Sequence, residues 1–217
     1  MFMRIPLFNR LKKQLHRDIA LLQDEVVELV YSIELNAVLH GGTAIWRCYS
    51  GNRFSEDLDF FIPKNEKFEE SFKEAIKSRQ LLLLKFKQTQ NNIFSKISNG
   101  EIEVRFEAAF RKARQFEPKS FEKIDGTFMD VFTLSPESLL VEKIEAFKNR
   151  MLIRDFYDIY FLSGIVSLND GLEKSLNELV KKNISPVDEK SLKALVFSGA
   201  IPSFKQMLES IKKRLKQ

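Results

Sequence analysis

The sequence predicts an α/β (α+β) protein in two parts, a mixed sheet with flanking helices followed by a helical C-terminal domain. Two observations favour this class. In the first part, short apolar runs alternate with Gly, Asn and Pro turn signals, as expected of strands. From Ser135 onward, apolar residues recur at helical spacing. We therefore place a domain boundary near Phe132, which divides the chain into residues 1–132 and residues 133–217.

The N-terminal part begins with a predicted amphipathic helix over Leu7–Ile33, because apolar residues, Leu15 among them, recur every three, four or seven positions. A hydroxyl at Thr43 is placed to cap a short helix. Pro63 ends the acidic strand at Ile62, since proline offers no N–H to a β-ladder. The predicted elements of this stretch are the strand Ala37–Leu39, the helix Thr43–Tyr49 and the acidic strand contained in Phe54–Ile62.

The middle of the chain reads as a helix over Glu66–Arg79 and then a group of strands. Asn99-Gly100 is a strong hairpin signal between two of them. The predicted strands are Leu81–Lys87, Ile93–Ile97, Glu101–Phe106 and Thr127–Thr133, with an irregular stretch over Phe110–Lys123. Ser135 is a capping residue before Pro136, which begins a helix. Further helices are expected at about Arg154–Ser163, Leu168–Lys182, Asp188–Phe197 and Ser203–Lys216.

Composition sets broad limits on function. The 217 residues carry a net charge of +5, and the pI is about 9.2. This balance suits an anionic partner such as RNA, although a solvated lysine-rich surface explains it equally well. A single cysteine excludes an internal disulfide and fits a reducing compartment. We find no signal-peptide pattern and no membrane-spanning run, so we expect a cytoplasmic protein without a membrane partner.

Two acids near position 60 are the strongest indication of chemistry. Asp57 and Asp59 are two residues apart, so on a strand they project from the same face. Neighbouring carboxylates repel each other unless a cation lies between them, and Mg²⁺ (or Mn²⁺) is the expected metal. Upstream, Gly41-Gly42-Thr43 supplies backbone N–H groups and a hydroxyl at a helix start, where phosphate oxygens bind. The pattern predicts a site for a metal ion and a nucleoside triphosphate.

At this point the sequence resembles the nucleotidyltransferase superfamily, and more narrowly the AbiEii/AbiGii (MenT-like) toxins of type IV toxin–antitoxin systems. The resemblance rests on His40-Gly-Gly-Thr-Ala44, Arg53-Phe-Ser-Glu-Asp-Leu-Asp-Phe60 and a second block, Leu140–Arg150 with Arg154-Asp155-Phe-Tyr-Asp158. It implies a nucleotidyltransferase fold and transfer of a nucleotide to the 3′ end of tRNA, which blocks translation. A cognate antitoxin is implied as a partner.

The resemblance also assigns site residues. It implies that Lys143 reaches over the triphosphate and that Asp158 is catalytic, with Arg154 and Asp155 beside it. Asp155 either belongs to the site or has a structural role, in a pair with Arg150 or Arg154. The residues themselves place Ser55 within reach of a phosphate, although a plain loop serine is equally expected. Arg47 and Arg53 flank this region and are plausible anion contacts, although a solvated arginine is the default.

One departure from the superfamily pattern leaves the general base open. Many nucleotidyltransferases carry a third carboxylate on a later strand, and here the centre of that strand is Arg105. Glu103 and Glu107 point the same way as Arg105 and are two candidates, and Asp158 is the third. Two other functions therefore remain open. These are nucleotidylation of a protein or small-molecule hydroxyl, and an inactive nucleotide- or RNA-binding module.

Overall fold

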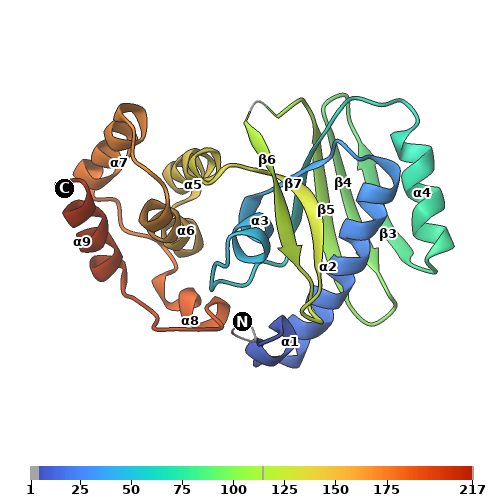
Figure 1. Ribbon diagram of the computed structural model, residues 1–217, viewed down its shortest axis with the longest axis horizontal. Helices are drawn as coiled ribbons and strands as arrows, with labels where there is room; N and C mark the ends of the chain where they lie inside the picture. Colours follow the sequence, from blue (N-terminus) through green and yellow to red (C-terminus); the bar gives the residue numbers. More distant parts are fainter. Residues whose placement is uncertain (1–4, 114, 217) are drawn as a thin grey trace.

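The computed structural model describes residues 5–113 and 115–216 of the chain. Its centre is a seven-stranded mixed sheet with the strand order β3-β4-β5-β2-β1-β7-β6 (Figure 1). The strands are β1 (Val38–His40), β2 (Leu58–Ile62), β3 (Leu82–Gln88), β4 (Asn92–Ser98), β5 (Glu103–Phe110), β6 (Phe116–Glu122) and β7 (Phe128–Leu134). None of the helices in the described ranges is long and apolar enough to cross a membrane.

The pairing of the central strands places polar side chains side by side. β1 runs antiparallel to β2 and parallel to β7, and β2 runs parallel to β5. In this register His40 lies opposite Asp59, and Asp59 lies opposite Glu107. Because side chains alternate between the faces of a strand, these three residues share one face of the sheet.

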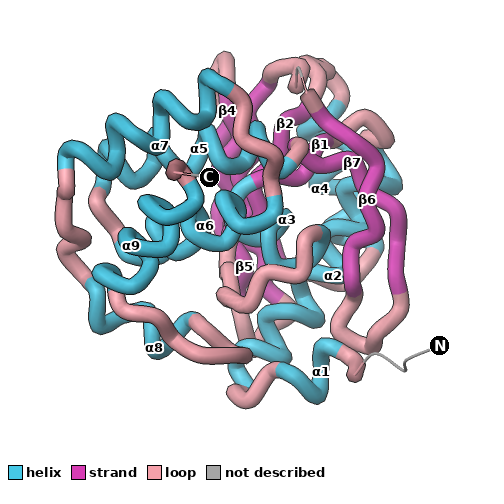
Figure 2. The backbone as a smooth tube through the Cα atoms, turned by 60° about the vertical axis from the view of Figure 1, so that its left-hand side comes forward, coloured by secondary structure: helices cyan, strands magenta, loops and turns pink. Residues whose placement is uncertain are grey.

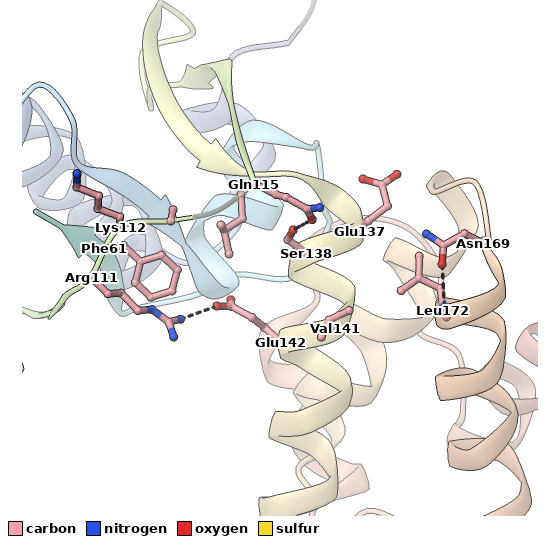
Figure 3. Close-up of a pocket in the computed structure, with 13 residues that line it drawn as sticks. Phe61, Arg111, Lys112, Gln115, Glu137, Ser138, Val141, Glu142, Asn169 and Leu172 are labelled. Carbon is pink, nitrogen blue, oxygen red and sulfur yellow. Dashed lines mark hydrogen bonds and ion pairs between the residues drawn. The ribbon is translucent and has the colours of Figure 1, made fainter.

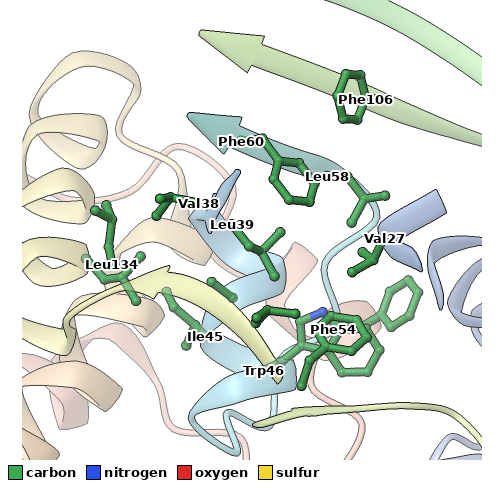
Figure 4. Close-up of a cluster of buried hydrophobic side chains, with 14 of the residues drawn as sticks. Val27, Val38, Leu39, Ile45, Trp46, Phe54, Leu58, Phe60, Phe106 and Leu134 are labelled. Carbon is green, nitrogen blue, oxygen red and sulfur yellow. The ribbon is translucent and has the colours of Figure 1, made fainter. Parts of the chain in front are cut away.

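The other face of this sheet carries the apolar core beneath two helices, α2 (Gln14–Ile33) and α4 (Phe68–Ser78). Phe72 of α4 stacks on Phe106 of β5, with ring centroids 4.9 Å apart. Figure 4 shows Leu39, Leu58, Phe60 and Phe106 of the sheet in the same buried cluster as Val27 of α2, Ile45, Trp46 and Phe54. β5 shows the alternation best, since Val104, Phe106 and Ala108 are buried while Glu103 and Arg105 are exposed.

The chain after β7 is helical, and it forms a separate layer to one side of the sheet (Figures 1 and 2). Its elements are α5 (Pro136–Arg150), α6 (Ile153–Ile165), α7 (Asp170–Lys182), a 3₁₀ turn at Glu189–Ser191, α8 (Leu192–Leu195) and α9 (Phe204–Arg214). Ser135 caps α5 by accepting a hydrogen bond from the Ser138 N–H, as the sequence predicts. The boundary near Phe132 stays a prediction, while β7 itself continues to Leu134.

Two backbone hydrogen bonds join the helical layer to the loop that leads into β2. The Phe54 N–H donates to the Leu195 carbonyl at 2.9 Å, and the Phe197 N–H donates to the Asn52 carbonyl at 3.0 Å. The intervening Arg53 forms an isolated antiparallel bridge with Val196. The C-terminal part therefore fixes the backbone of a loop that lies far from it in sequence.

The predicted fold class is confirmed, but the first helix is not continuous. It divides into α1 (Leu7–Arg10) and α2, because Lys13 is extended and precedes a new helix start. The break changes the helical phase, so Leu15 is 55% exposed although the periodicity places it on the apolar face. Arg17 donates to the Leu11 carbonyl within the break, which satisfies an acceptor that a continuous helix would have used.

The stretch Phe110–Lys123 is not irregular, since it contains β6 at the edge of the sheet. Pro118 lies within this strand opposite Phe132. A proline is tolerated there because an edge strand needs hydrogen bonds on one side only. Local sequence signals do not identify such a strand, because its pairing with β7 provides the stabilising hydrogen bonds.

Arg47 is buried rather than solvated, and it links three parts of the sheet domain. It lies in α3 (Gly41–Cys48) between the rings of Trp46 and Phe121, and it forms an ion pair with Asp24 of α2. The other Asp24 oxygen accepts the Ile124 N–H at 2.8 Å. A buried charge requires such partners, because desolvation is otherwise uncompensated.

Burial of His16 predicts an acid-sensitive fold. Its ring stacks on Phe54 with centroids 4.0 Å apart. Burial, with a smaller contribution from Lys13, lowers the pKa of His16 to about 4 from an ordinary value near 6.5. Between these values the unfolded chain binds more protons, so this group makes stability fall as the pH drops from about 6.5 towards 4.

Replacing His16 by Phe should retain the stacking and remove this pH dependence. We expect the unfolding free energy of the wild type to fall more steeply than that of His16→Phe between pH 7 and 5. The difference should approach the order of 1–2 kcal/mol at pH 5. Urea denaturation at fixed ionic strength measures it, and parallel curves for the two proteins would contradict the assignment.

Candidate active site

Asp59 and Asp57 lie where α3 begins, at the N-terminal end of β2. Within Phe54–Ile62 the strand begins at Leu58, so Asp59 lies within β2 and Asp57 immediately precedes it. Thr43 does not cap α3, because the helix already begins at Gly41. Its hydroxyl instead donates to the Asp57 carbonyl at 2.6 Å, which holds the backbone of the acid pair against the helix.

Two glycines allow this close approach. Gly41 has a positive φ of 71°, and a Cβ at this position would lie 2.3 Å from Asp59 Oδ2. At Gly42 a Cβ would lie 2.4 Å from Ser55 Oγ and 2.5 Å from Arg53 Nη2. Any side chain at either position would displace the site, so both positions require glycine.

Glu107 is the acid that lies beside the pair. It is opposite Asp59 on the neighbouring strand β5. Burial first, and then the charges of Asp59 and Asp57, raise its pKa. Glu103 is four residues earlier on the same strand, where it is exposed and pairs with Lys96 at 2.5 Å. Of the three candidates for a general base, Glu107 alone lines the same cavity as the pair.

Asp158 is fully buried and holds two cations. Arg53 binds it through both oxygens, at 2.7 Å and 2.8 Å, and Lys143 Nζ lies 2.9 Å from Oδ2. Burial opposes ionisation, but Arg53 and Lys143 outweigh it and lower the pKa of Asp158. A carboxylate in this state is a weak base, and its contacts orient Arg53 and Lys143 towards the acid pair.

Asp155 has a similar position behind a third cation. Arg150 donates to both of its oxygens, at 2.6 Å and 2.7 Å, and Lys143 lies 3.8 Å away. The sequence allowed two roles for Asp155, a structural pair with Arg150 or Arg154 and a place in the active site. The structure places it in the pair, with its side chain fully buried.

The cations and acids face one another across a cavity of about 180 Å³. The residues that line it are Gly42, Arg53, Ser55, Asp57, Asp59, Arg105, Glu107, Lys143, Arg150 and Arg154. Five of them are cations and three are acids. The surplus of positive charge, next to the N–H groups at the start of α3, suits a phosphate chain.

The acid pair fits a divalent cation. Asp57 Oδ1 is buried and accepts no hydrogen bond from the described residues, and Arg105 Nε lies 3.0 Å from it. Burial, and secondarily the charge of Asp57, raises the pKa of Asp59. The described part of the chain contains no preassembled cluster of three metal ligands. Two carboxylates are nevertheless a suitable donor set for Mg²⁺, which takes its remaining ligands from phosphates and water.

A larger cavity of about 860 Å³ lies on the other side of His40, between the end of β2 and helices α5 and α7 (Figure 3). Glu142 of α5 lies at its wall, 3.2 Å from His40 Nδ1 and 3.6 Å from Arg111. Arg111 lies over the Phe61 ring, 3.8 Å from its centroid. The volume is in the range of small-molecule sites.

Most of the residues expected in the site are gathered there. Those that line the cavity are Gly42, Ser55, Asp57, Asp59, Lys143 and Arg154. Gly41, Thr43, Asp155 and Asp158 lie immediately behind it. Arg53 was expected to be solvated and is instead buried in the site. The sequence marked Arg53 only as a plausible anion contact and could not show its burial, because its partner Asp158 is more than a hundred residues away.

Comparison with known proteins identifies the family and the fold. The family model described as Nucleotidyl transferase AbiEii toxin, Type IV TA system, matches residues 29–215. The solved structure of JHP933 from Helicobacter pylori is similar, with 21% identity, a TM-score of 0.66, and coverage of 94% of this chain and 91% of that one. At this level of identity the similarity shows a shared fold.

A second similar structure is MenT4, a nucleotidyltransferase toxin from Mycobacterium tuberculosis. It has 18% identity and a TM-score of 0.60, and the match covers 91% of this chain and 81% of that one. No protein with a curated description matches the chain in sequence.

Substitution of Asp158, which is paired with two cations, and of Asp59, which lies beside another carboxylate, should have opposite effects on stability. Asp158→Asn leaves Arg53 and Lys143 buried without a countercharge, and we expect it to lower the unfolding free energy by about 3 kcal/mol or more. Asp59→Asn removes one of two neighbouring carboxylates. In metal-free buffer with EDTA, we expect it to raise the melting temperature.

Thermal denaturation of both variants beside the wild type measures these effects. Glu70→Gln, an exposed position of α4, is the control and should change little. Equal destabilisation by Asp59→Asn and Asp158→Asn would mean that Asp59 is as structural as Asp158.

Proposed function

Because the chain belongs to the AbiEii family of nucleotidyltransferase toxins of type IV toxin–antitoxin systems, we propose that it transfers a nucleoside monophosphate from a nucleoside triphosphate to the 3′ end of tRNA and so blocks translation. One observation carries the proposal. Three carboxylates, Asp57, Asp59 and Glu107, face five cations across one small cavity. This separation of charge matches a metal-bound triphosphate whose reacting phosphorus lies at the acids.

In this proposal Asp57 and Asp59 hold Mg²⁺, and Mn²⁺ suits the same donors. When bound, the ion neutralises triphosphate charge and stabilises the charge that develops on the departing pyrophosphate. The N–H groups near Gly42 and the Ser55 hydroxyl contact phosphate oxygens. Lys143 and Arg154 neutralise the phosphate charge from the helical side.

Glu107 is the proposed general base. The acceptor hydroxyl loses its proton to the Glu107 carboxylate, and its oxygen bonds to the α-phosphorus as the bond to pyrophosphate breaks. Burial and the neighbouring acids raise the pKa of Glu107, which makes it a stronger base than a solvated glutamate. The contribution of Asp158 is to position Arg53 and Lys143, since its own oxygens are already occupied.

RNA is the favoured acceptor because the chain is basic, with a pI of about 9.2. A tRNA acceptor would place the reaction in the cytoplasm, where the antitoxin that the family implies would also act. A small-molecule or protein hydroxyl is the second candidate. The cavity between Phe61 and α7 supports it, because a compact acceptor would fit there, next to Glu142, which contacts His40.

A transfer assay tests the proposal. Purified protein, total tRNA and Mg²⁺ are incubated with each α-labelled triphosphate in turn, with and without EDTA. We expect label to enter tRNA only when the metal is present. Asp59→Asn should abolish transfer, and Glu107→Gln should slow it by about 10²–10⁴-fold, the usual contribution of a general base.

Glu103→Gln is the matched control, since it makes the same chemical change on the same strand at an exposed position. It should retain full activity. Label in protein or in a small molecule, and none in tRNA, would replace the proposed acceptor. Full activity of Glu107→Gln would remove it as the base.

A further inference from the structure

The outward face of strands β3 and β4 carries basic and aromatic side chains that lead to the acid pair. Phe86, between Lys85 and Lys87, packs towards Phe72 of α4, with ring centroids 6.2 Å apart. Because neighbouring side chains alternate, Lys85 and Lys87 point to the opposite face, and both are exposed. Phe94 of β4 lies on this outward face and is 39% exposed, whereas its neighbours Ile93 and Ser95 point to the other face and are buried.

The register connects these residues directly to the site. Lys87 lies opposite Phe94, Phe94 opposite Glu107, and Glu107 opposite Asp59. Strands are about 4.8 Å apart, so Phe94 is roughly 10 Å from Asp59 across the sheet. One row further along, Lys85 lies opposite Lys96. We name Lys85, Lys87, Phe94 and Lys96 the basic strip.

A groove of about 500 Å³ joins the basic strip to the acids. Phe94 lies at one side of it, and Asp59 and Glu107 form its wall, with Phe61 and Arg111 beyond them. The same two acids also line the small cationic cavity. The acids thus separate a cavity suited to phosphates from a more open groove with aromatic walls.

Resting on the proposed function, we propose that the basic strip and this groove bind the single-stranded 3′ end of the acceptor RNA. A nucleotide base stacks on Phe94, which is sequence-tolerant because every base has a π-face. Lys85 and Lys87 bind phosphates further from the end, and the terminal hydroxyl lies at Glu107. Lys96 already pairs with Glu103, so it contributes less.

Charge favours RNA over a protein partner on this face. Three of the four residues of the basic strip are cationic, and an exposed aromatic ring among lysines is the combination that binds single strands. Lysines on the edge strand β3 also disfavour pairing with another sheet. An acidic antitoxin on this face is the competing occupant, and the test below separates it from RNA.

The test measures binding apart from catalysis. Fluorescence anisotropy of a labelled single-stranded RNA oligonucleotide gives Kd at several salt concentrations in EDTA, without triphosphate. We expect Phe94→Ala to weaken binding tenfold or more. The double variant Lys85→Ala/Lys87→Ala should also weaken it and reduce the slope of log Kd against log salt by about 1.4, as expected for two phosphate contacts.

Matched controls change the same residue types elsewhere. Lys73→Ala/Lys77→Ala removes two exposed lysines of α4, on the opposite face of the sheet. Phe116→Ala removes a half-exposed ring from β6 at the far edge. Both controls should bind RNA like the wild type. In the transfer assay, the basic-strip variants should raise KM for RNA and leave KM for the triphosphate unchanged.

The outcomes separate this inference from the proposed function. If basic-strip variants and controls bind RNA equally, the inference is wrong even when label enters tRNA normally. If the wild type does not bind RNA, the inference is wrong, and label in another acceptor would redirect the function. If binding depends on the basic strip but no label is transferred, the strip is an RNA site and the proposed reaction fails.

Discussion

The buried contact of Asp158 with Arg53 and Lys143 holds the site together. It joins α6, the loop before β2 and α5, three segments that are distant in sequence. Both carboxylate oxygens of Asp158 accept hydrogen bonds from Arg53, and one of them also forms an ion pair with Lys143. The strongly desolvated group is stable only because both partners are present. The positions of the two cations relative to Asp59 therefore depend on one carboxylate that does not line the cavity.

The backbone reinforces this contact. Asn52 and Phe54 pair with the segment after α8, so the loop that carries Arg53 is fixed on both sides. Gly42 approaches Arg53 and Ser55 so closely that no side chain fits between them. The sheet domain and the helical layer consequently define the cavity together.

In the site, the fold places the acids at the sheet and most of the cations on the helices that face it. Asp59 and Glu107 lie on neighbouring strands with Asp57 just before β2, and burial together with the repulsion among these acids raises the pKa of Asp59 and Glu107. The facing cations come mainly from α5 and the start of α6. Arg105, which looked like a departure from the family pattern, is not a substitute for an acid. It pairs with Asp57 from β5, and Glu107, two residues later on the same strand, lies opposite Asp59 and is the proposed general base.

The sequence by itself determined the elements whose signals are local. The glycine pair, the Asp57–Asp59 spacing and the Ser135 cap each depend on residues within a few positions of one another, so a single sequence shows them. It also indicated most of the mixed sheet and the helical C-terminal part. The tertiary structure alone showed how Glu103, Glu107 and Asp158 differ in position, because strand register places Glu107 beside Asp59. It also placed Arg53 in the site and β6 in the sheet, since the partners of both lie far away in the chain. Buried ion pairs and edge-strand pairing are stabilised only after the chain has folded, and so they leave no local pattern to read.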